Sequence, residues 1–429
     1  MGLQEKESFV YDESREKMPK KEREKWLNQR LVDIVEYAYK NVPPVKDKFD
    51  KAGLSPSEIR SIKDLEKIPI TSKDELVRMQ QANPPYGGFL TVPVNKLNRV
   101  YISPGPIYDV GDSSRVKGYA RHMRAAGFAH PGDIVIVTAN YHMVPFGLLV
   151  TDALDLLGFT VVPAGVGQTE LQVKIMHDLK VTGFFGFPSF LMSIIKKAEE
   201  MGYNFRRDFN VKWAVGTGER HIQILRKQFE EDYGIEISQN YGTADVGLLG
   251  YECAEKNGMH YNDEDAIIEI VNPQTGKQCA SLEEGEVVVT LLNKVYPLIR
   301  FGTGDLSSYT DEPCPCGRTS PKLTAITGMI GDHVRAKGMF IHGRELDEAM
   351  SGFSELSKYQ MVLSLEGHKD VIGLNLETKQ AVDQKALSDA IRKRCKDVFR
   401  LTVDKISFLP TGTLPEAYKK FVDERWGSK

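Results

Sequence analysis

Apolar runs alternate with amphipathic stretches through the middle of the chain. Five short runs rich in β-branched and aromatic residues lie at 133–138, 160–163, 183–187, 212–215 and 235–238. Three stretches with apolar residues at helical spacing lie between them, at 170–179, 189–201 and 221–233. This alternation is typical of parallel βαβ units, in which ligand sites lie in loops at the carboxyl ends of the strands. We therefore expect an α/β fold with candidate chemistry in those loops.

The pattern changes after residue 260. Short strands bounded by turn residues are predicted at 266–271 and 286–292, which indicates an antiparallel layer beside the parallel one. Segment 328–338, with three glycines, is typical of a hinge. The remaining sequence predicts a small α+β unit with strands at 359–365, 371–376 and 405–408 and a helix at 384–398. We expect a large N-terminal domain, 1–328, and a small mobile C-terminal domain, 329–429.

The N-terminal segment has a different pattern. Residues 15–40 are highly charged, with apolar residues near helical spacing, and predict an amphipathic helix that acts as an embracing arm. Residues 64–76 predict a turn-rich connector. The charge in such segments is most simply explained by a solvated helix face.

Composition limits the class of ligand. The 429 residues include 56 Lys and Arg and 59 Asp and Glu, so the net charge of -3 gives no electrostatic basis for binding nucleic acid or an anionic membrane. The most apolar long stretch, 143–167, is interrupted by Asp152 and Asp155 and is too polar to span a membrane. The first thirty residues have no apolar core typical of a secretory signal. We expect a cytoplasmic protein that binds small molecules.

One candidate loop, Tyr241-Gly-Thr-Ala-Asp245, follows the last parallel run. The Tyr241 ring offers a stacking face, and Gly242 permits close approach of the backbone. The Thr243 hydroxyl can bond a phosphate, and Asp245 can hold a cation or a water beside it. The alternative is an ordinary turn with incidental polar residues.

Two other loops carry glycines next to a carboxylate. The sequence Arg300-Phe-Gly-Thr-Gly-Asp305 ends an apolar run and presents a carboxylate suited to accept two ribose hydroxyls. Gly218 and Glu219 follow another strand, where the glycine allows close approach to a planar base. Each loop taken alone is equally an ordinary turn in which a polar side chain stabilises its own backbone.

Together, in their order and spacing, these loops resemble the phenylacetate-CoA ligase branch of the adenylate-forming enzymes, from about residue 120 to the C-terminus. Further matching segments are Cys316-Gly-Arg-Thr319, Lys337-Gly338 and Gly412-Thr-Leu-Pro415. The resemblance implies a ligase that uses ATP and Mg²⁺ to form an acyl-adenylate and transfers the acyl group to CoA after the C-terminal domain rotates. It also implies nucleotide contacts, which fall on Glu219, Tyr241, Thr243, Asp245, Asp305 and Arg318.

The resemblance further implies a lysine near the C-terminus that acts in the adenylation transition state. Counting from the segment 412–415 places this lysine at Lys420, with Lys419 adjacent. Two exposed surface lysines are the alternative. The family and the N-terminal arm together suggest a homodimer.

Two segments depart from the family pattern. The place of the expected Ser/Thr/Gly-rich phosphate loop reads Tyr101-Ile-Ser-Pro-Gly-Pro-Ile-Tyr108, and proline lacks the N–H with which such loops hold phosphate. Ser103 remains as a donor. At the hinge an expected arginine is replaced by Met329, which leaves Asp332 as the pivot. Two alternatives therefore stay open: an acid-adenylating protein with an acceptor other than CoA, and a non-catalytic nucleotide or acyl-CoA binding homologue.

A second cluster of residue types points to a metal. Six residues separate Cys253 from His260, and Cys314-Pro-Cys316 supplies two thiolates on a turn. Three sulfurs and one imidazole form a closed tetrahedral set of the kind that zinc takes in structural sites. The sequence predicts a structural zinc at these four residues, with reduced packing cysteines and a surface histidine as the alternative.

Aromatic residues indicate where an acid substrate binds. Tyr141, His142 and Phe146 follow the first parallel run, and Phe187 ends the third. Aromatic walls suit an aryl or other apolar carboxylic acid. His142 is placed to meet the carboxylate, although a lone histidine in an apolar neighbourhood is more often a packing residue.

Overall fold

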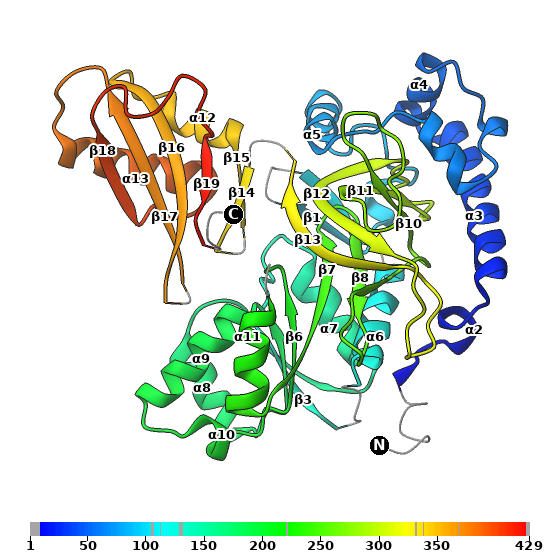
Figure 1. Cartoon of the computed structure of the whole chain (residues 1–429), viewed down its shortest axis with the longest axis horizontal. Coiled ribbons are helices and arrows are strands. Elements are labelled where there is room, and N and C mark those ends of the chain that lie inside the picture. The colour runs from blue at the N-terminus through cyan, green and yellow to red at the C-terminus, as the bar shows by residue number, and fades with distance from the viewer. Residues whose placement is uncertain are drawn as a thin grey trace. The chain divides into compact units, whose positions relative to one another are not determined.

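The structure is a computed structural model that describes residues 9–103, 107–111, 113–127, 132–219, 222–330, 333–337, 339–367 and 369–425. Internal contacts divide the chain into two compact units, Met1–Met329 and Ile330–Lys429. Each unit has its own hydrophobic core and is described separately (Figure 1).

The α-helices are α2 Glu13–Glu16, α3 Lys20–Asn41, α4 Pro43–Lys51, α5 Lys73–Ala82, α6 Val116–Ala125, α7 Phe146–Leu156, α8 Thr169–Asp178, α9 Pro188–Glu200, α10 Phe205–Asp208, α11 Ile222–Gln228, α12 Gly343–Met350 and α13 Gln384–Phe399. The strands of the first unit are β1 Arg99–Ser103, β2 Ile107–Gly111, β3 Ile134–Val137, β4 Thr160–Pro163, β5 Gly183–Gly186, β6 Trp213–Thr217, β7 Glu236–Thr243, β8 Gly247–Glu252, β9 Met259–Tyr261, β10 Ala266–Val271, β11 Gly285–Leu291, β12 Phe301–Thr310 and β13 Lys322–Met329. Those of the second are β14 His333–Ala336, β15 Met339–His342, β16 Leu356–Glu366, β17 Lys369–Thr378, β18 Lys405–Leu409 and β19 Phe421–Asp423.

One mixed sheet of eleven strands forms the centre of the first unit, in the order β10-β11-β12-β13-β9-β8-β7-β6-β5-β3-β4. Strands β4, β3, β5, β6 and β7 are parallel, and every pairing from β7 to β10 is antiparallel. The predicted fold class, parallel βαβ units with an antiparallel layer, is confirmed. The two parts share one sheet because β7 pairs in parallel with β6 and in antiparallel with β8.

Helices cover both faces of the parallel half. Helices α8, α9 and α11 lie on one face and α6 and α7 on the other (Figure 1). Neighbouring residues of β5 show why: Phe184 packs in the core of the α8 and α9 layer, whereas Phe185 packs in the core of the α6 and α7 layer. Because successive side chains of a strand point to opposite faces, a sheet covered on both sides needs consecutive apolar residues.

The N-terminal helices share a core with the antiparallel half of the sheet. Leu31 and Val35 of α3 are fully buried in the same cluster as Val289 of β11. The helix expected at 15–40 is present as α2 and α3. The turn-rich connector expected at 64–76 ends earlier than predicted, because its last residues, 73–76, form the first turn of helix α5.

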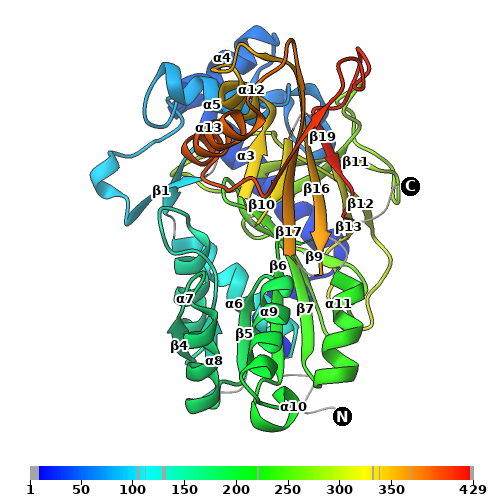
Figure 2. The same cartoon turned by 90° about the vertical axis from the view of Figure 1, so that its left-hand side faces the viewer.

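The second unit has a four-stranded sheet in the order β18-β17-β16-β19, with β16 and β17 as a long antiparallel pair (Figure 2). Helices α12 and α13 pack together and share a core with this sheet. The predicted α+β arrangement is therefore found. The proposed hinge residue Asp332 lies outside the described residues. In the part of the chain that the structure describes, no helix is long and apolar enough to cross a membrane.

Candidate active site and cysteine–histidine cluster

Two of the sequence-predicted loops meet through a direct hydrogen bond. The Tyr241 hydroxyl at the end of β7 donates to Asp305 Oδ2 on β12 over 2.8 Å, and a second contact joins it to Thr303 Oγ1 at 3.3 Å. Burial and the charge of Asp305 raise the pKa of Tyr241 well above its usual range, so its hydroxyl remains a donor. The Asp305 carboxylate of β12 is thus held in one orientation by a side chain of β7.

Asp245, the carboxylate at the end of the Tyr241–Asp245 loop, is 2% exposed. Its Oδ2 atom accepts from the Thr243 hydroxyl at 3.3 Å and from Lys73 Nζ at 3.0 Å. Its Oδ1 atom has no hydrogen-bond partner among the described residues. One lone-pair edge of this carboxylate is therefore left for a cation or water, as the chemistry predicted for the loop requires.

Gly242 is needed for a reason that sequence reasoning did not identify. A Cβ atom at this position would lie 2.4 Å from the carbonyl oxygen of Gly247 on β8. The register of the β7–β8 pair also shifts between Tyr241 and Gly242. The close neighbour of this glycine is therefore protein backbone, which lets the end of β7 fold against β8.

The loop after β6 is built around a helix cap. Gly218 adopts a left-handed backbone, at φ 71°, which suits glycine. The Glu219 carboxylate accepts hydrogen bonds from the Ser189 amide, at 3.0 Å, and from the Ser189 hydroxyl. Ser189 lies in the first turn of α9, so Glu219 satisfies donors at that helix end. This contact fixes the loop and occupies the Glu219 side chain.

Ser103 belongs to the β1–β2 hairpin. Its buried hydroxyl donates to the Ile107 carbonyl at 3.4 Å across the hairpin. In the same hairpin Asp109 is 2% exposed, and neither of its carboxylate oxygens has a hydrogen-bond partner among the residues that the structure describes. The segment in place of a phosphate loop thus brings a buried carboxylate to the site.

The four residues predicted as zinc ligands come together. The Sγ atoms of Cys253, Cys314 and Cys316 and a ring nitrogen of His260 all lie within 4.8 Å of one another. Cys253 and Cys314 are 3.7 Å apart between sulfurs, and Cys316 Sγ lies 3.4 Å from His260 Nε2. Hydrogen bonding from Cys253 and then from His260 lowers the pKa of the Cys316 thiol to about 2. The donor set fits Zn²⁺ in number, type and spacing.

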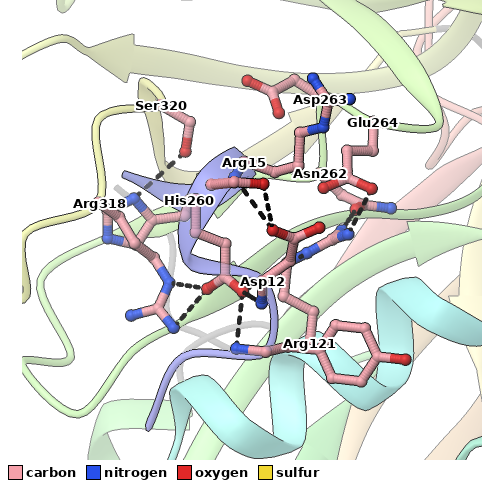
Figure 3. A network of polar contacts seen from close by, with 12 residues as sticks. Asp12, Arg15, Arg121, His260, Asn262, Asp263, Glu264, Arg318 and Ser320 are labelled. Carbon is pink, nitrogen blue, oxygen red and sulfur yellow. Dashed lines mark hydrogen bonds and ion pairs between the residues drawn. The ribbon is translucent and has the colours of Figure 1, made fainter. Parts of the chain in front are cut away.

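The imidazole of His260 is oriented from its other side. Its Nδ1 atom faces the Ser320 hydroxyl at 3.4 Å (Figure 3). Its Nε2 atom therefore points to the sulfur of Cys316. A hydrogen bond at the second ring nitrogen is how proteins commonly fix a metal-binding histidine. The cluster joins the segment after β8 to the segment after β12.

Arg318, for which the family resemblance implied nucleotide support, lies on the loop between β12 and β13. Its guanidinium donates to Glu16 Oε2 at 2.7 Å and to the Phe9 carbonyl at 2.5 Å, and it faces the Tyr251 ring. Both side chains of the Arg318–Glu16 pair are 2% exposed. These contacts tie the N-terminal segment to the cysteine-rich loop, and none of them supports the implied nucleotide role.

Comparison with known proteins gives the family. No model of a known protein family matches the chain. Phenylacetate-coenzyme A ligase of Aromatoleum evansii is 30% identical over 366 residues, which is 81% of this chain and 80% of the relative. The chain belongs to the phenylacetate-CoA ligase family. The enzyme of the same name from Thermus thermophilus is 29% identical and covers 95% of this chain and 97% of its own length.

A solved structure of a CoA ligase has a similar fold over almost the whole chain. The 2-hydroxyisobutyryl-CoA ligase in complex with its acyl-AMP and CoA matches with a TM-score of 0.90 and 25% identity, over 98% of this chain and 93% of that one. These relatives confirm the expected enzyme class, an AMP-forming acid–thiol ligase. The two-unit α/β architecture is that of the family.

The residues predicted for the acid pocket differ in burial: three aromatic residues are half-buried, and His142 is exposed. Phe146 packs at 5.6 Å from Phe185 and 6.0 Å from Tyr119, between ring centroids. The Tyr141 hydroxyl is 2.9 Å from the Thr151 hydroxyl. Like these two residues, Phe187, at the cap of α9, is half-buried. His142 is exposed, and its backbone amide donates to Asn140 Oδ1 at 2.8 Å.

Lys420, the lysine implied by the family, lies in the second unit. Its Nζ atom contacts both oxygens of Asp347, at 2.7 and 2.6 Å. The Tyr359 hydroxyl donates to the same carboxylate at 2.6 Å. The ammonium is thus held by one carboxylate of its own unit, and both partners of the pair are partly exposed.

Sequence reasoning missed three charged residues of the candidate site. Lys73 begins helix α5, and Asp109 lies in the β1–β2 hairpin. Arg115 donates to the carbonyls of Ala244 and Asp245. No motif marks these residues, because each is far in sequence from the loop that it contacts. A lone lysine in a predicted turn-rich connector carries no signal that it is buried.

Proposed function

We propose that this chain is an ATP-dependent ligase that joins an aryl or similar apolar carboxylic acid to CoA through an acyl-adenylate. Two lines of support carry the proposal: the family to which the chain belongs, and one local observation. The Tyr241 hydroxyl orients the Asp305 carboxylate through a hydrogen bond of 2.8 Å to Asp305 Oδ2. A fixed, buried carboxylate at this turn is suited to accept the two ribose hydroxyls of a nucleotide.

The adenylation step builds negative charge around the α-phosphorus. Mg²⁺ would supply charge neutralisation there, as in other phosphoryl and nucleotidyl transfers. Of the residues present, Asp245 fits a cation, because its Oδ1 atom is buried without a partner and its Oδ2 atom is already bonded. Thr243, through its hydroxyl, and Ser103 are the polar neighbours that we assign to the phosphates.

The acid would lie against aromatic side chains. Tyr141, Phe146 and Phe187 are half-buried, which leaves part of each ring for an apolar ligand. Rotation of the second unit, with Lys420 as the cation that serves adenylation, completes the proposal. Relatives named as CoA ligases support CoA as the acceptor.

Pyrophosphate exchange into ATP tests the proposal. Purified protein with Mg²⁺ is assayed with a panel of aryl and short aliphatic acids, without CoA and then with it. We expect exchange with at least one apolar acid and thioester formation when CoA is added. Exchange without any use of CoA would identify an acceptor of another kind. Nucleotide binding by calorimetry without exchange for any acid would identify the non-catalytic homologue.

We also propose that Cys253, His260, Cys314 and Cys316 bind a structural zinc. The set is closed, so the ion would pin two loops of the first unit and leave no position for substrate. Protein purified without chelator is expected to hold about one zinc per chain, and Cys314→Ser to lose it and melt at a lower temperature. Cys279→Ser is the control, because Cys279 Sγ bonds the Glu284 carbonyl outside the cluster. Less than about 0.2 zinc per chain in the wild type would contradict the proposal.

A further inference from the structure

A lysine of the N-terminal segment is delivered to the candidate nucleotide site by the backbone. Thr71 forms an isolated parallel bridge with Phe301, at the start of β12. The Thr71 amide donates to the Arg300 carbonyl at 3.0 Å, and the Gly302 amide donates to the Thr71 carbonyl at 3.0 Å. Helix α5 begins two residues later, at Lys73. The position of Lys73 is thus tied to the strand that carries Asp305.

The ammonium of Lys73 lies at the carboxylate that we assign to the cation. Its Nζ atom is 3.0 Å from Asp245 Oδ2, and the side chains are 17% and 2% exposed. Arg115 holds the same loop through the Ala244 and Asp245 carbonyls, so the loop does not depend on Lys73 alone. A buried ion pair of this kind is expensive to desolvate and is weak support for stability by itself.

The charges around Lys73 keep it ionised. Burial lowers the pKa of Lys73, but the attraction of Asp245, Asp109 and Asp305 outweighs it, and the pKa is raised above its usual value. Burial and then the charge of Asp245 raise the pKa of Asp109 to about 7, opposed by Arg115 and Lys73. The cluster therefore offers one fixed ammonium among three carboxyl groups.

The atypical loop explains why a cation is needed here. The sequence 101–108 has prolines at 104 and 106, which remove two backbone N–H donors from the segment where the family holds phosphate. A lysine ammonium provides three donors and a full charge. It binds phosphate as a point charge and needs no loop geometry.

We propose that Lys73 is a phosphate-binding residue of this enzyme. When a divalent cation binds Asp245, the Lys73 ammonium leaves this carboxylate and binds a phosphate oxygen of the nucleotide. The proposal rests on the proposed function, since it names the group that holds the phosphates at that same site. No bond forms or breaks in this exchange, and the ammonium keeps its proton.

Calorimetry with Mg²⁺–ATP and with adenosine tests the assignment. The main variant is Lys73→Gln, which keeps a donor towards Asp245 and removes the charge. We expect it to bind ATP about 10- to 100-fold more weakly, the range for loss of a hydrogen bond to a charged group, and to bind adenosine within about twofold of the wild type. Lys73→Arg keeps the charge and is expected to restore most of the ATP affinity.

Lys96→Gln is the matched control, because Lys96 is exposed in the short helix Val94–Lys96. Three results overturn the proposal. The first two are an unchanged ATP affinity in Lys73→Gln and equal losses for ATP and adenosine, which would indicate a structural lysine. A fall in Lys73→Arg as large as that in Lys73→Gln also overturns it. If the wild type binds neither ligand, the proposed function itself fails, and this outcome is distinct from the other three.

Discussion

His122 illustrates how one buried residue sets the acid limit of the fold. Its ring is fully buried, with Nε2 2.9 Å from the Ser238 hydroxyl and Nδ1 3.3 Å from the Asn240 amide. Burial and then the charge of Arg318 lower the pKa of His122 to about 3. The neutral imidazole therefore belongs to the folded state, and its ring also lies beside Tyr251.

Stability should fall as the pH drops from about 6.5 towards 3. In this window the unfolded chain binds a proton at His122 and the folded chain does not, so each pH unit lowers the free energy of unfolding by up to about 1.4 kcal/mol. Urea denaturation of His122→Gln at several pH values should give a shallower acid limb than the wild type. The variant is less stable at pH 8, because its new side chain packs less well. Identical slopes would show that His122 titrates alike in both states.

The contact between Tyr241 and Asp305 makes a second prediction at the residue scale. Asp305→Ala should abolish nucleotide binding. Tyr241→Phe keeps the carboxylate but removes its oriented donor, and a hydrogen bond to a charged group contributes about 1.5–3 kcal/mol. We expect its KM for ATP to rise about tenfold, with the melting temperature close to that of the wild type. Equal KM values in Tyr241→Phe and the wild type would contradict a positioning role for the tyrosine.

Residue types were easier to predict than residue partners. The motif order located Tyr241 and Asp305, because glycine turns at strand ends have a recognisable pattern. The same pattern could not show that Glu219 caps α9 or that Arg318 pairs with Glu16. Both partners lie far away in sequence, and a charged residue in a motif gives no information on which opposite charge reaches it.

Among the elements, α2 is held by an ion pair that the sequence did not reveal. Glu16 of this helix and Arg318 are each 2% exposed in their side chains, with 2.6 Å between the charged atoms. Glu13 of the same helix pairs with Lys17 at the surface and is 74% exposed. The two glutamates therefore form a natural comparison of a buried and a solvated pair within one turn.

Glu16→Gln should destabilise the protein by about 3–5 kcal/mol, because it leaves the Arg318 guanidinium buried without its counter-charge. Glu13→Gln should change stability by less than about 1 kcal/mol, as is usual for a surface pair. Chemical denaturation of the two variants at equal ionic strength gives the comparison. Similar small effects in both would mean that the N-terminal segment contributes little to the folded first unit.

Strands with a simple period were predicted well, and elements defined by long-range pairing were not. The predicted run 266–271 coincides with β10, because five of its six residues are apolar and both sides of the strand are buried. The long strands β12 and β13 carry polar residues and bulges, so their period is broken. Helix α5 was read as part of a connector because its apolar residues are few. Its place depends on the bridge at Thr71, which no local pattern encodes.

At the scale of the whole molecule, the two units divide the proposed reaction between them. Asp305, Asp245 and the cysteine–histidine cluster lie in the first unit, and Lys420 lies in the second. In the proposed function, Lys420 serves adenylation in the transition state and has no part in thioester formation. The two half-reactions should therefore respond differently to its loss, since an interaction made only in a transition state affects only the step that passes through it.

Lys420→Ala should slow acid-dependent pyrophosphate exchange by about 100-fold or more, the usual loss when one charge-stabilising group is removed. Its affinity for ATP should change by less than about threefold, because the contact is absent from the ground state. Thioester formation from supplied acyl-adenylate and CoA should proceed at the wild-type rate.

Lys419→Ala is the control variant, because Lys419 is the neighbouring lysine and is exposed. A loss of exchange in Lys419→Ala with none in Lys420→Ala would move the catalytic role by one residue. Equal slowing of both half-reactions in Lys420→Ala would instead show that the lysine only maintains its own unit through Asp347.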